Sequence, residues 1–109
     1  MDEIEKLAEI FKALSDPTRL RLVKLLSEQP PSEHPGTCNG QGFLCVNALA
    51  HRLGVTQSAV SQHLRVLRQV GLVQGERRGP FVHYSLDKDG LKKYSVALLD
   101  TLGEDFAVR

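Results

Sequence analysis

Residues 48–71, Ala-Leu-Ala-His-Arg-Leu-Gly-Val-Thr-Gln-Ser-Ala-Val-Ser-Gln-His-Leu-Arg-Val-Leu-Arg-Gln-Val-Gly, predict two helices joined by a tight turn. The first, apolar helix ends at Gly54, and Thr56 can cap a second helix that is polar along one face. This order is typical of a helix-turn-helix, whose second helix enters the major groove of DNA. Residues 72–86 follow as two strand-forming runs around Gly-Glu-Arg-Arg-Gly-Pro, which predicts a basic β-hairpin. Together the two parts predict a winged helix.

The rest of the 109-residue chain predicts helices on either side of this unit. Apolar residues recur at helical spacing near both ends, and Asp16 followed by Pro17 marks a helix start. Turn-forming residues fill positions 30–42, so this segment is expected to be a loop. We therefore expect one domain over 1–109, mainly α with a small β-hairpin wing. The five helices are expected at about 2–14, 17–28, 44–53, 57–70 and 88–103, with the helix-turn-helix over 44–70 and the wing over 72–86.

Positive charge is concentrated on the predicted helix-turn-helix and hairpin. The net charge of the chain is only +1, but residues 51–86 carry five arginines against one acidic residue, Glu76. Taken alone, such a charge suits either a solvated basic face or a nucleic-acid-binding surface. Its coincidence with the helix-turn-helix favours binding to double-stranded DNA.

The second helix of the motif divides into an apolar and a polar face. Val60, Leu64 and Leu67 recur at spacings of four and three residues and are expected to face the core. On the polar face, glutamine can pair with adenine through two hydrogen bonds, and serine hydroxyls donate or accept. Arginines farther along the helix are expected to hold backbone phosphates. The candidate base-contacting residues are Gln57, Ser58, Ser61 and Gln62, and the candidate phosphate-contacting residues are Arg65 and Arg68.

Other polar residues of these elements have more than one interpretation. His63 lies beside an apolar position of the second helix, so it can pack, hydrogen-bond to a phosphate, or do both. Arg77 and Arg78 stand at the hairpin tip, where a wing commonly lies on the DNA backbone or along the minor groove. On the returning strand, His83 is expected to be structural, and Tyr84 can be structural as well.

The first and last predicted helices are apolar over a broader arc than a small monomer easily covers. Ile10 and Phe11 are adjacent, as are Leu98 and Leu99. An ordinary core can explain this arc, but we favour a homodimer interface built from both ends of the chain. A homodimer would also present two recognition helices to the half-sites of a palindromic operator, about one DNA turn apart.

The sequence lacks the signatures of several other protein classes. No apolar run approaches the roughly 18 residues of a membrane span, and the acidic N-terminus does not look like a signal peptide, so we expect a cytoplasmic protein. An enzyme is disfavoured because there is no Cys-x-x-Cys, no paired carboxylates in a plausible cleft and no phosphate-binding glycine loop. A winged helix that uses its basic face to bind an acidic protein remains an alternative.

Three motifs carry a family resemblance: Phe-Lys-Ala-Leu-Ser-Asp-Pro-Thr-Arg-Leu-Arg-Leu (11–22), Ser-Ala-Val-Ser-Gln-His-Leu-Arg-Val-Leu (58–67) and Gly-Leu-Val (71–73). Together they resemble the ArsR/SmtB family of winged-helix repressors, over nearly the whole chain except the 30–42 loop. The resemblance implies a homodimer, joined through its first and last helices, that represses a promoter and releases DNA when an effector binds. It also implies that Ser58, Ser61, Gln62 and His63 read DNA.

The metal sites of that family are only partly matched. Members that sense arsenic or other thiophilic ions often carry Cys-Val-Cys in the third helix, whereas Cys45 is followed here by Val46 and Asn47. Members that sense zinc use acidic and histidine ligands at the last helix. The positions aligned with those ligands hold Lys88, Gly90, Thr101 and Glu104. The departures count against carrying over either kind of site.

A second cysteine offers a different thiol site. Cys38 precedes Cys45 by seven residues, in a loop whose glycines would let two sulfurs meet. Cys45 is expected at a helix N-terminus, where the dipole favours the thiolate. The pair can bind a thiophilic metalloid or metal ion, or oxidise to a disulfide. His34 is a further candidate ligand, although we favour its interpretation as a solvent-exposed loop histidine. Alternatively, Cys45 is a small buried apolar residue and Cys38 an incidental loop residue.

An effector acting at these thiols would change how the helix-turn-helix sits within the dimer. Release from the operator requires a difference of only about 1–3 kcal/mol between the free and effector-bound forms. A repressor without thiol-based sensing is the alternative.

Overall fold

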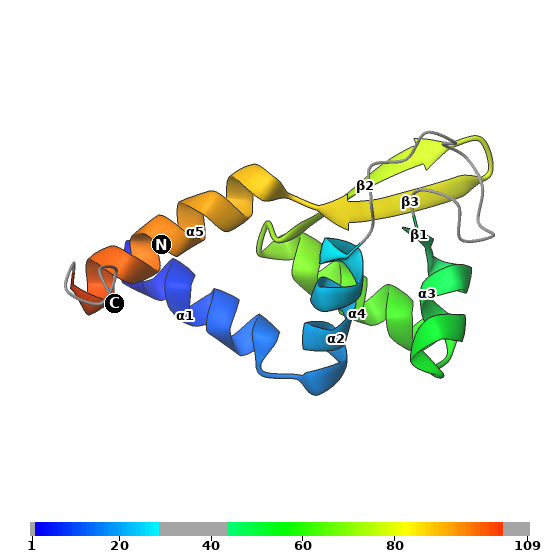
Figure 1. The fold of residues 1–109 in the computed structure, drawn as a ribbon, viewed down its shortest axis with the longest axis horizontal. Coiled ribbons are helices and arrows are strands. Elements are labelled where there is room, and N and C mark those ends of the chain that lie inside the picture. Colours follow the sequence, from blue (N-terminus) through cyan, green and yellow to red (C-terminus); the bar gives the residue numbers. More distant parts are fainter. Residues whose placement is uncertain (1, 29–43, 104–109) are drawn as a thin grey trace.

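The protein folds as a winged helix-turn-helix, which a computed structural model describes over residues 2–28 and 44–103 (Figure 1). These residues form five helices and three short strands, which confirms the predicted mainly α fold with a β-hairpin wing. The helices are α1 (Glu3–Leu14), α2 (Pro17–Ser27), α3 (Val46–Leu53), α4 (Gln57–Gln69) and α5 (Lys88–Leu102), and the strands are β1 (Leu44–Cys45), β2 (Val73–Arg78) and β3 (Phe81–Leu86). The predicted 30–42 loop lies outside the described residues. No helix within them is long and apolar enough to cross a membrane.

Capping residues set the helix boundaries that the sequence predicted. The Asp16 carboxylate accepts hydrogen bonds from the first turn of α2, whose first residue is Pro17. Helix α3 ends at Leu53, and its C-cap residue Gly54 has a φ of 68°, a left-handed conformation that favours glycine. The Thr56 hydroxyl then accepts a hydrogen bond of 3.1 Å from the backbone N–H of Ala59 and caps α4. The turn between α3 and α4 is therefore specified locally.

The start of α3 differs from the prediction. A helix is predicted from about residue 44, but α3 begins at Val46, and Leu44 and Cys45 form strand β1 instead. In β1, Leu44 pairs with Tyr84 and Cys45 pairs with His83, antiparallel to β3. Pairing satisfies backbone groups along an edge of β3 that would otherwise be open, so tertiary contact overrides the helical pattern. Strand β1 thus extends the β2–β3 hairpin of the wing to a three-stranded sheet in the order β1-β3-β2.

The core lies where α2, α3 and α4 meet the sheet. Leu22 of α2, Leu49 of α3 and Leu64 of α4 are each at most 1% exposed. Leu72 and Val73 continue this cluster from the end of α4 into β2. Burial of one such leucine contributes roughly 1.5–3 kcal/mol, so this cluster holds the helix-turn-helix and the wing together.

Helices α1 and α5 pack side by side at the end of the molecule opposite the wing tip (Figure 1). Their buried residues include Ile10 and Ala97, but other large apolar side chains remain exposed in the single chain. The exposed set on these two helices is Ile4, Phe11, Val96, Leu99 and Leu102. The predicted broad apolar arc is therefore present, and the isolated chain leaves it uncovered.

The first turn of α5 fits closely against the turn that follows α4. The backbone N–H of Asp87 donates to the carbonyl oxygen of Leu72 at 2.9 Å, and the Asp87 carboxylate accepts from the backbone N–H of Gly90 at 3.0 Å. A Cβ atom at Gly90 would lie only 2.2 Å from the carbonyl oxygen of Gly71. Glycine at position 90 is therefore what allows α5 to approach the end of α4 this closely.

Candidate DNA-binding surface

Helix α4 has one buried face and one exposed face, as its sequence predicted. Val60, Leu64 and Leu67 are at most 1% exposed and anchor the helix to the core. The candidate DNA-contacting residues Gln57, Ser58, Ser61, Gln62, Arg65 and Arg68 are all exposed. The helix therefore offers hydrogen-bonding groups and cations to solvent on a rigid, apolar support. Contact of these side chains with DNA stays a prediction.

The exposed face of α4 is linked to α3 at its beginning. The Gln57 side-chain amide donates a hydrogen bond of 2.9 Å to the side-chain oxygen of Asn47. Asn47 lies in the first turn of α3, two residues after Cys45. In the sequence, Asn47 is notable only because it occupies the position of the second cysteine of the Cys-Val-Cys motif. The structure gives it a direct role in orienting Gln57.

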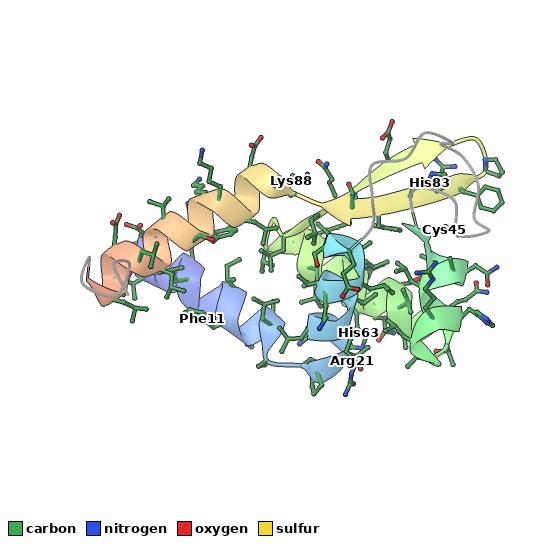
Figure 2. All side chains as sticks on the ribbon, viewed as in Figure 1. Phe11, Arg21, Cys45, His63, His83 and Lys88 are labelled. Carbon is green, nitrogen blue, oxygen red and sulfur yellow. The ribbon has the colours of Figure 1, made fainter. Side chains whose placement is uncertain are left out.

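His63 lies on the flank of α4, partly exposed, and contacts α2 (Figure 2). Its Nδ1 atom is 3.2 Å from Nη1 of Arg19. The Nε of Arg19 also donates to the backbone carbonyl of Ala13, at the end of α1. Arg19 therefore connects three helices through one side chain. The residue pattern alone gives no sign of this role, although Arg19 belongs to the Asp-Pro-Thr-Arg segment of the first motif.

Asp16 supports this arrangement through the start of α2. Its carboxylate accepts hydrogen bonds from the backbone N–H groups of Arg19 and Thr18, at 3.2 and 2.8 Å. The hydrogen bond from Arg19 lowers the pKa of Asp16 below its ordinary value; the Thr18 N–H and nearby positive charge act in the same direction, and desolvation opposes them. Because the pKa is lowered on folding, the cap stabilises the fold at neutral pH, and this contribution is lost as the pH falls through the lowered value.

The wing presents Arg77 to solvent and buries His83. Arg77 is exposed, and its Nη1 is 3.4 Å from the carbonyl oxygen of Gly79, where the chain turns. The side chain of Arg78 lies outside the described part of the structure. His83 is 1% exposed and stacks against Phe81 with 6.5 Å between ring centroids, in agreement with its expected structural role. Tyr84, on the same strand, packs against the core.

Cys45 occupies the junction between the wing and α3 (Figure 2). It is the N-cap residue of α3, as expected, but its side chain is 3% exposed and it is disulfide-bonded. It lines a cavity of about 390 Å³ together with residues of the wing and with Asn47 and Gln57. Cys38 and His34 lie outside the described residues. The candidate sensing position thus lines the same cavity as Gln57, the first residue of α4.

The positions aligned with metal ligands in α5 have other uses here. Lys88 is an exposed cation, and the position of Gly90 has no room for a larger side chain. The Thr101 hydroxyl donates to the carbonyl oxygen of Ala97 at 2.9 Å, and Glu104 lies outside the described residues. Over residues 2–28 and 44–103, no group of three or more His, Cys, Asp or Glu side chains is arranged to hold a metal ion.

Comparison with known sequences identifies related regulators. The sequence profile of the family described as "Bacterial regulatory protein, arsR family" matches residues 39–74. An HTH-type transcriptional regulator of Methanocaldococcus jannaschii is 35% identical over 102 residues, covering 94% of this chain and 100% of the relative. The arsenical resistance operon repressor of Escherichia coli K12 is 40% identical over 78 residues, covering 72% of this chain and 56% of that repressor.

Solved structures show the same architecture. An ArsR-like transcriptional regulator from Rhodococcus sp. RHA1 superimposes with a TM-score of 0.70 and 28% sequence identity. The match covers 97% of this chain and 87% of that one, so the likeness extends from the first helix to the last.

Proposed function

This chain belongs to the ArsR family of DNA-binding transcriptional regulators, and from that membership we propose that it is a homodimeric repressor whose α4 helices read a palindromic operator. The observation that carries the proposal is the exposed polar face of α4, which lies opposite three fully buried apolar residues. In this proposal, residues 1–109 form one DNA-binding domain. Because a transcriptional regulator works where the chromosome is, the proposed location is the cytoplasm.

The polar residues of α4 fall into two groups with different proposed DNA contacts. Gln57, Ser58, Ser61 and Gln62 occupy the N-terminal half of the helix, the part that reaches base edges in a helix-turn-helix. Arg65 and Arg68 lie farther along, where cations contact phosphates. Arg77 and Arg78 of the wing would add phosphate or minor-groove contacts beside them.

Exposed apolar residues on α1 and α5 support the dimer. Phe11 and Leu102 are each 50% exposed, and Leu99 is 40% exposed, all on the two helices that carry the chain ends. A second copy packed on these helices would remove their apolar surface from water, at roughly 25 cal/mol per Å². It would also present two α4 helices related by a two-fold axis, which matches a palindrome.

Substitutions on α4 test the reading of DNA. Gln62→Ala should lower affinity for an operator selected from random duplexes by about 10-fold, because a good base contact contributes about 1–3 kcal/mol. The matched control is Gln69→Ala, which removes the same kind of exposed side chain from the C-terminal end of α4. Arg65→Ala should instead weaken binding to all sequences and reduce the slope of log affinity against log salt by about one. Equal affinity of Gln62→Ala and Gln69→Ala for the operator would refute the base-reading role.

The proposed effector acts at thiols. Cys38 and Cys45 are the only cysteines of the chain, and a relative with 40% identity is named an arsenical resistance operon repressor. In the reduced state the pair would offer two sulfur ligands to a thiophilic metalloid. In oxidation, the two thiols lose two electrons and two protons to a peroxide and form a disulfide; hydrogen peroxide is reduced to two molecules of water, and an alkyl hydroperoxide to an alcohol and water.

The surroundings of Cys45 support its coupling to DNA release. Cys45 is backbone-paired to β3 of the wing, and two residues later Asn47 holds the Gln57 amide of α4. A change at the sulfur that shifts the start of α3 would therefore act on both candidate DNA-contacting elements. Only about 1–3 kcal/mol of differential stability is needed for release.

Replacing both cysteines tests the effector. Cys38→Ser/Cys45→Ser should bind the operator like the natural protein but no longer be released by arsenite or peroxide, because neither reagent has its sulfur target. Zinc is tested as a third candidate effector in the same operator-binding assay. Because Cys45 is buried, Cys38→Ser/Cys45→Ala provides a version that keeps an apolar side chain in the core. Release of both double variants at the natural effector concentration would remove the cysteines from the mechanism.

A further inference from the structure

We propose that Arg19 holds His63 as the neutral tautomer with its proton on Nε2, so that α4 presents this N–H group as a donor to a DNA phosphate. The inference rests on the proposed meeting of α4 with DNA, and it assigns a positioning role to Arg19, which lies outside the recognition helix.

The tautomer follows from the chemistry of the two partners. Nη1 of Arg19 is 3.2 Å from Nδ1 of His63. A guanidinium carries only donors and keeps its proton under all ordinary conditions. Nδ1 must therefore accept the hydrogen bond, and the single proton of the neutral ring lies on Nε2.

Arg19 is itself held in place by other hydrogen bonds, so it can select one tautomer of His63. Its Nε donates to the carbonyl oxygen of Ala13 in α1, a residue that is 3% exposed. Its backbone N–H donates to the Asp16 carboxylate at the start of α2. Because the guanidinium is held at Nε and the backbone of Arg19 is held at its N–H, Nη1 reaches the ring from one direction, and a flip of the imidazole would lose this hydrogen bond.

The position of His63 on α4 suits a phosphate contact. His63 follows exposed Gln62 and precedes buried Leu64, so its ring lies at the edge of the exposed face. With Nδ1 directed to Arg19, the opposite ring nitrogen is directed away from that contact. A neutral N–H donor at the edge of a recognition helix positions the protein on the duplex without reading sequence.

Nitrogen NMR of the free protein tests the tautomer without any DNA. In ¹⁵N-histidine-labelled protein at slightly alkaline pH, the His63 ring, assigned with His63→Gln, should show an unprotonated Nδ1 and a protonated Nε2. Arg19→Ala should produce a mixture of tautomers. Arg21→Ala is the matched control, because it removes an exposed arginine from the same helix and should leave the His63 signals unchanged. A protonated Nδ1 in the natural protein would overturn the proposal.

Operator affinity tests the phosphate contact separately. His63→Ala should weaken binding by about 10-fold, because a hydrogen bond to a charged group typically contributes about that factor or more. His63→Gln, which keeps a donor, should retain most of the affinity. Arg19→Ala/His63→Ala should bind no more weakly than the weaker single variant, since both act through one contact. Natural affinity of His63→Ala, or independent losses that multiply, would overturn the proposal. If the natural protein bound no operator, the proposed function would fail while the NMR result stood.

Discussion

Leu99→Asp should convert the protein from a dimer into a monomer and lower its operator affinity by about 100-fold or more. Leu99 is 40% exposed on α5, next to the other exposed apolar residues of α1 and α5. An aspartate inside that interface would leave a charge without a partner in an apolar surface, which is costly. Each monomer would keep one intact α4 but lose the second half-site, and linkage of two binding modules raises affinity by about 10²–10⁴-fold.

Sedimentation and DNA binding together check this result. The variant should sediment as a monomer and bind a full operator only as tightly as a single half-site. Leu20→Asp controls for the added charge in the sedimentation measurement, since Leu20 is a 50% exposed apolar residue on α2, outside the α1 and α5 surface. A Leu99→Asp protein that remains dimeric would show that the dimer uses another surface.

Gly90→Ala should lower the free energy of unfolding by about 1–3 kcal/mol, the usual cost of inserting a methyl group into a closely packed position. Its Cβ would lie 2.2 Å from the backbone carbonyl oxygen of Gly71, so the first turn of α5 would have to move away from the end of α4. Elsewhere in a helix interior, alanine is more favourable than glycine by about 1 kcal/mol, so a loss here goes against the intrinsic helix preference.

Denaturant unfolding measures this difference directly. Lys88→Ala is the matched control, because it places alanine at an exposed position of the same helical turn and should change stability little (Figure 2). A Gly90→Ala protein as stable as the natural one would mean that α5 does not need this close contact. Loss of the contact should also weaken operator binding, because α5 connects the proposed dimer surface to the end of α4.

The parts of this structure that the sequence predicts are those fixed by neighbouring residues. Gly54, Thr56 and the Asp16–Pro17 pair each set a boundary through their own backbone geometry or a cap within three residues. The buried and exposed faces of α4 likewise follow from helical spacing. Such signals are complete within a few positions of the chain, so they can be recognised before the fold is known.

The parts that the sequence does not predict depend on residues far apart in the chain. Strand β1 exists because Cys45 pairs with His83, and the contact of His63 is made with Arg19, 44 residues away. The link between Asn47 and Gln57 requires the angle between two helices to be known. Neither spacing nor propensity encodes such pairings, because they form only when the whole core has assembled.

The shortness of β1 has a consequence for how abruptly the protein would leave its operator. Cys45 is both the last residue of a two-residue strand paired to the wing and the N-cap of α3, whose Asn47 side chain accepts a hydrogen bond from Gln57 of α4. The wing and α4 are therefore both linked to the start of α3. A structural change at Cys45 would therefore weaken the DNA contacts of the wing and those of α4 together. Each subunit should therefore release DNA in a single step, without an intermediate in which only the wing contacts the duplex.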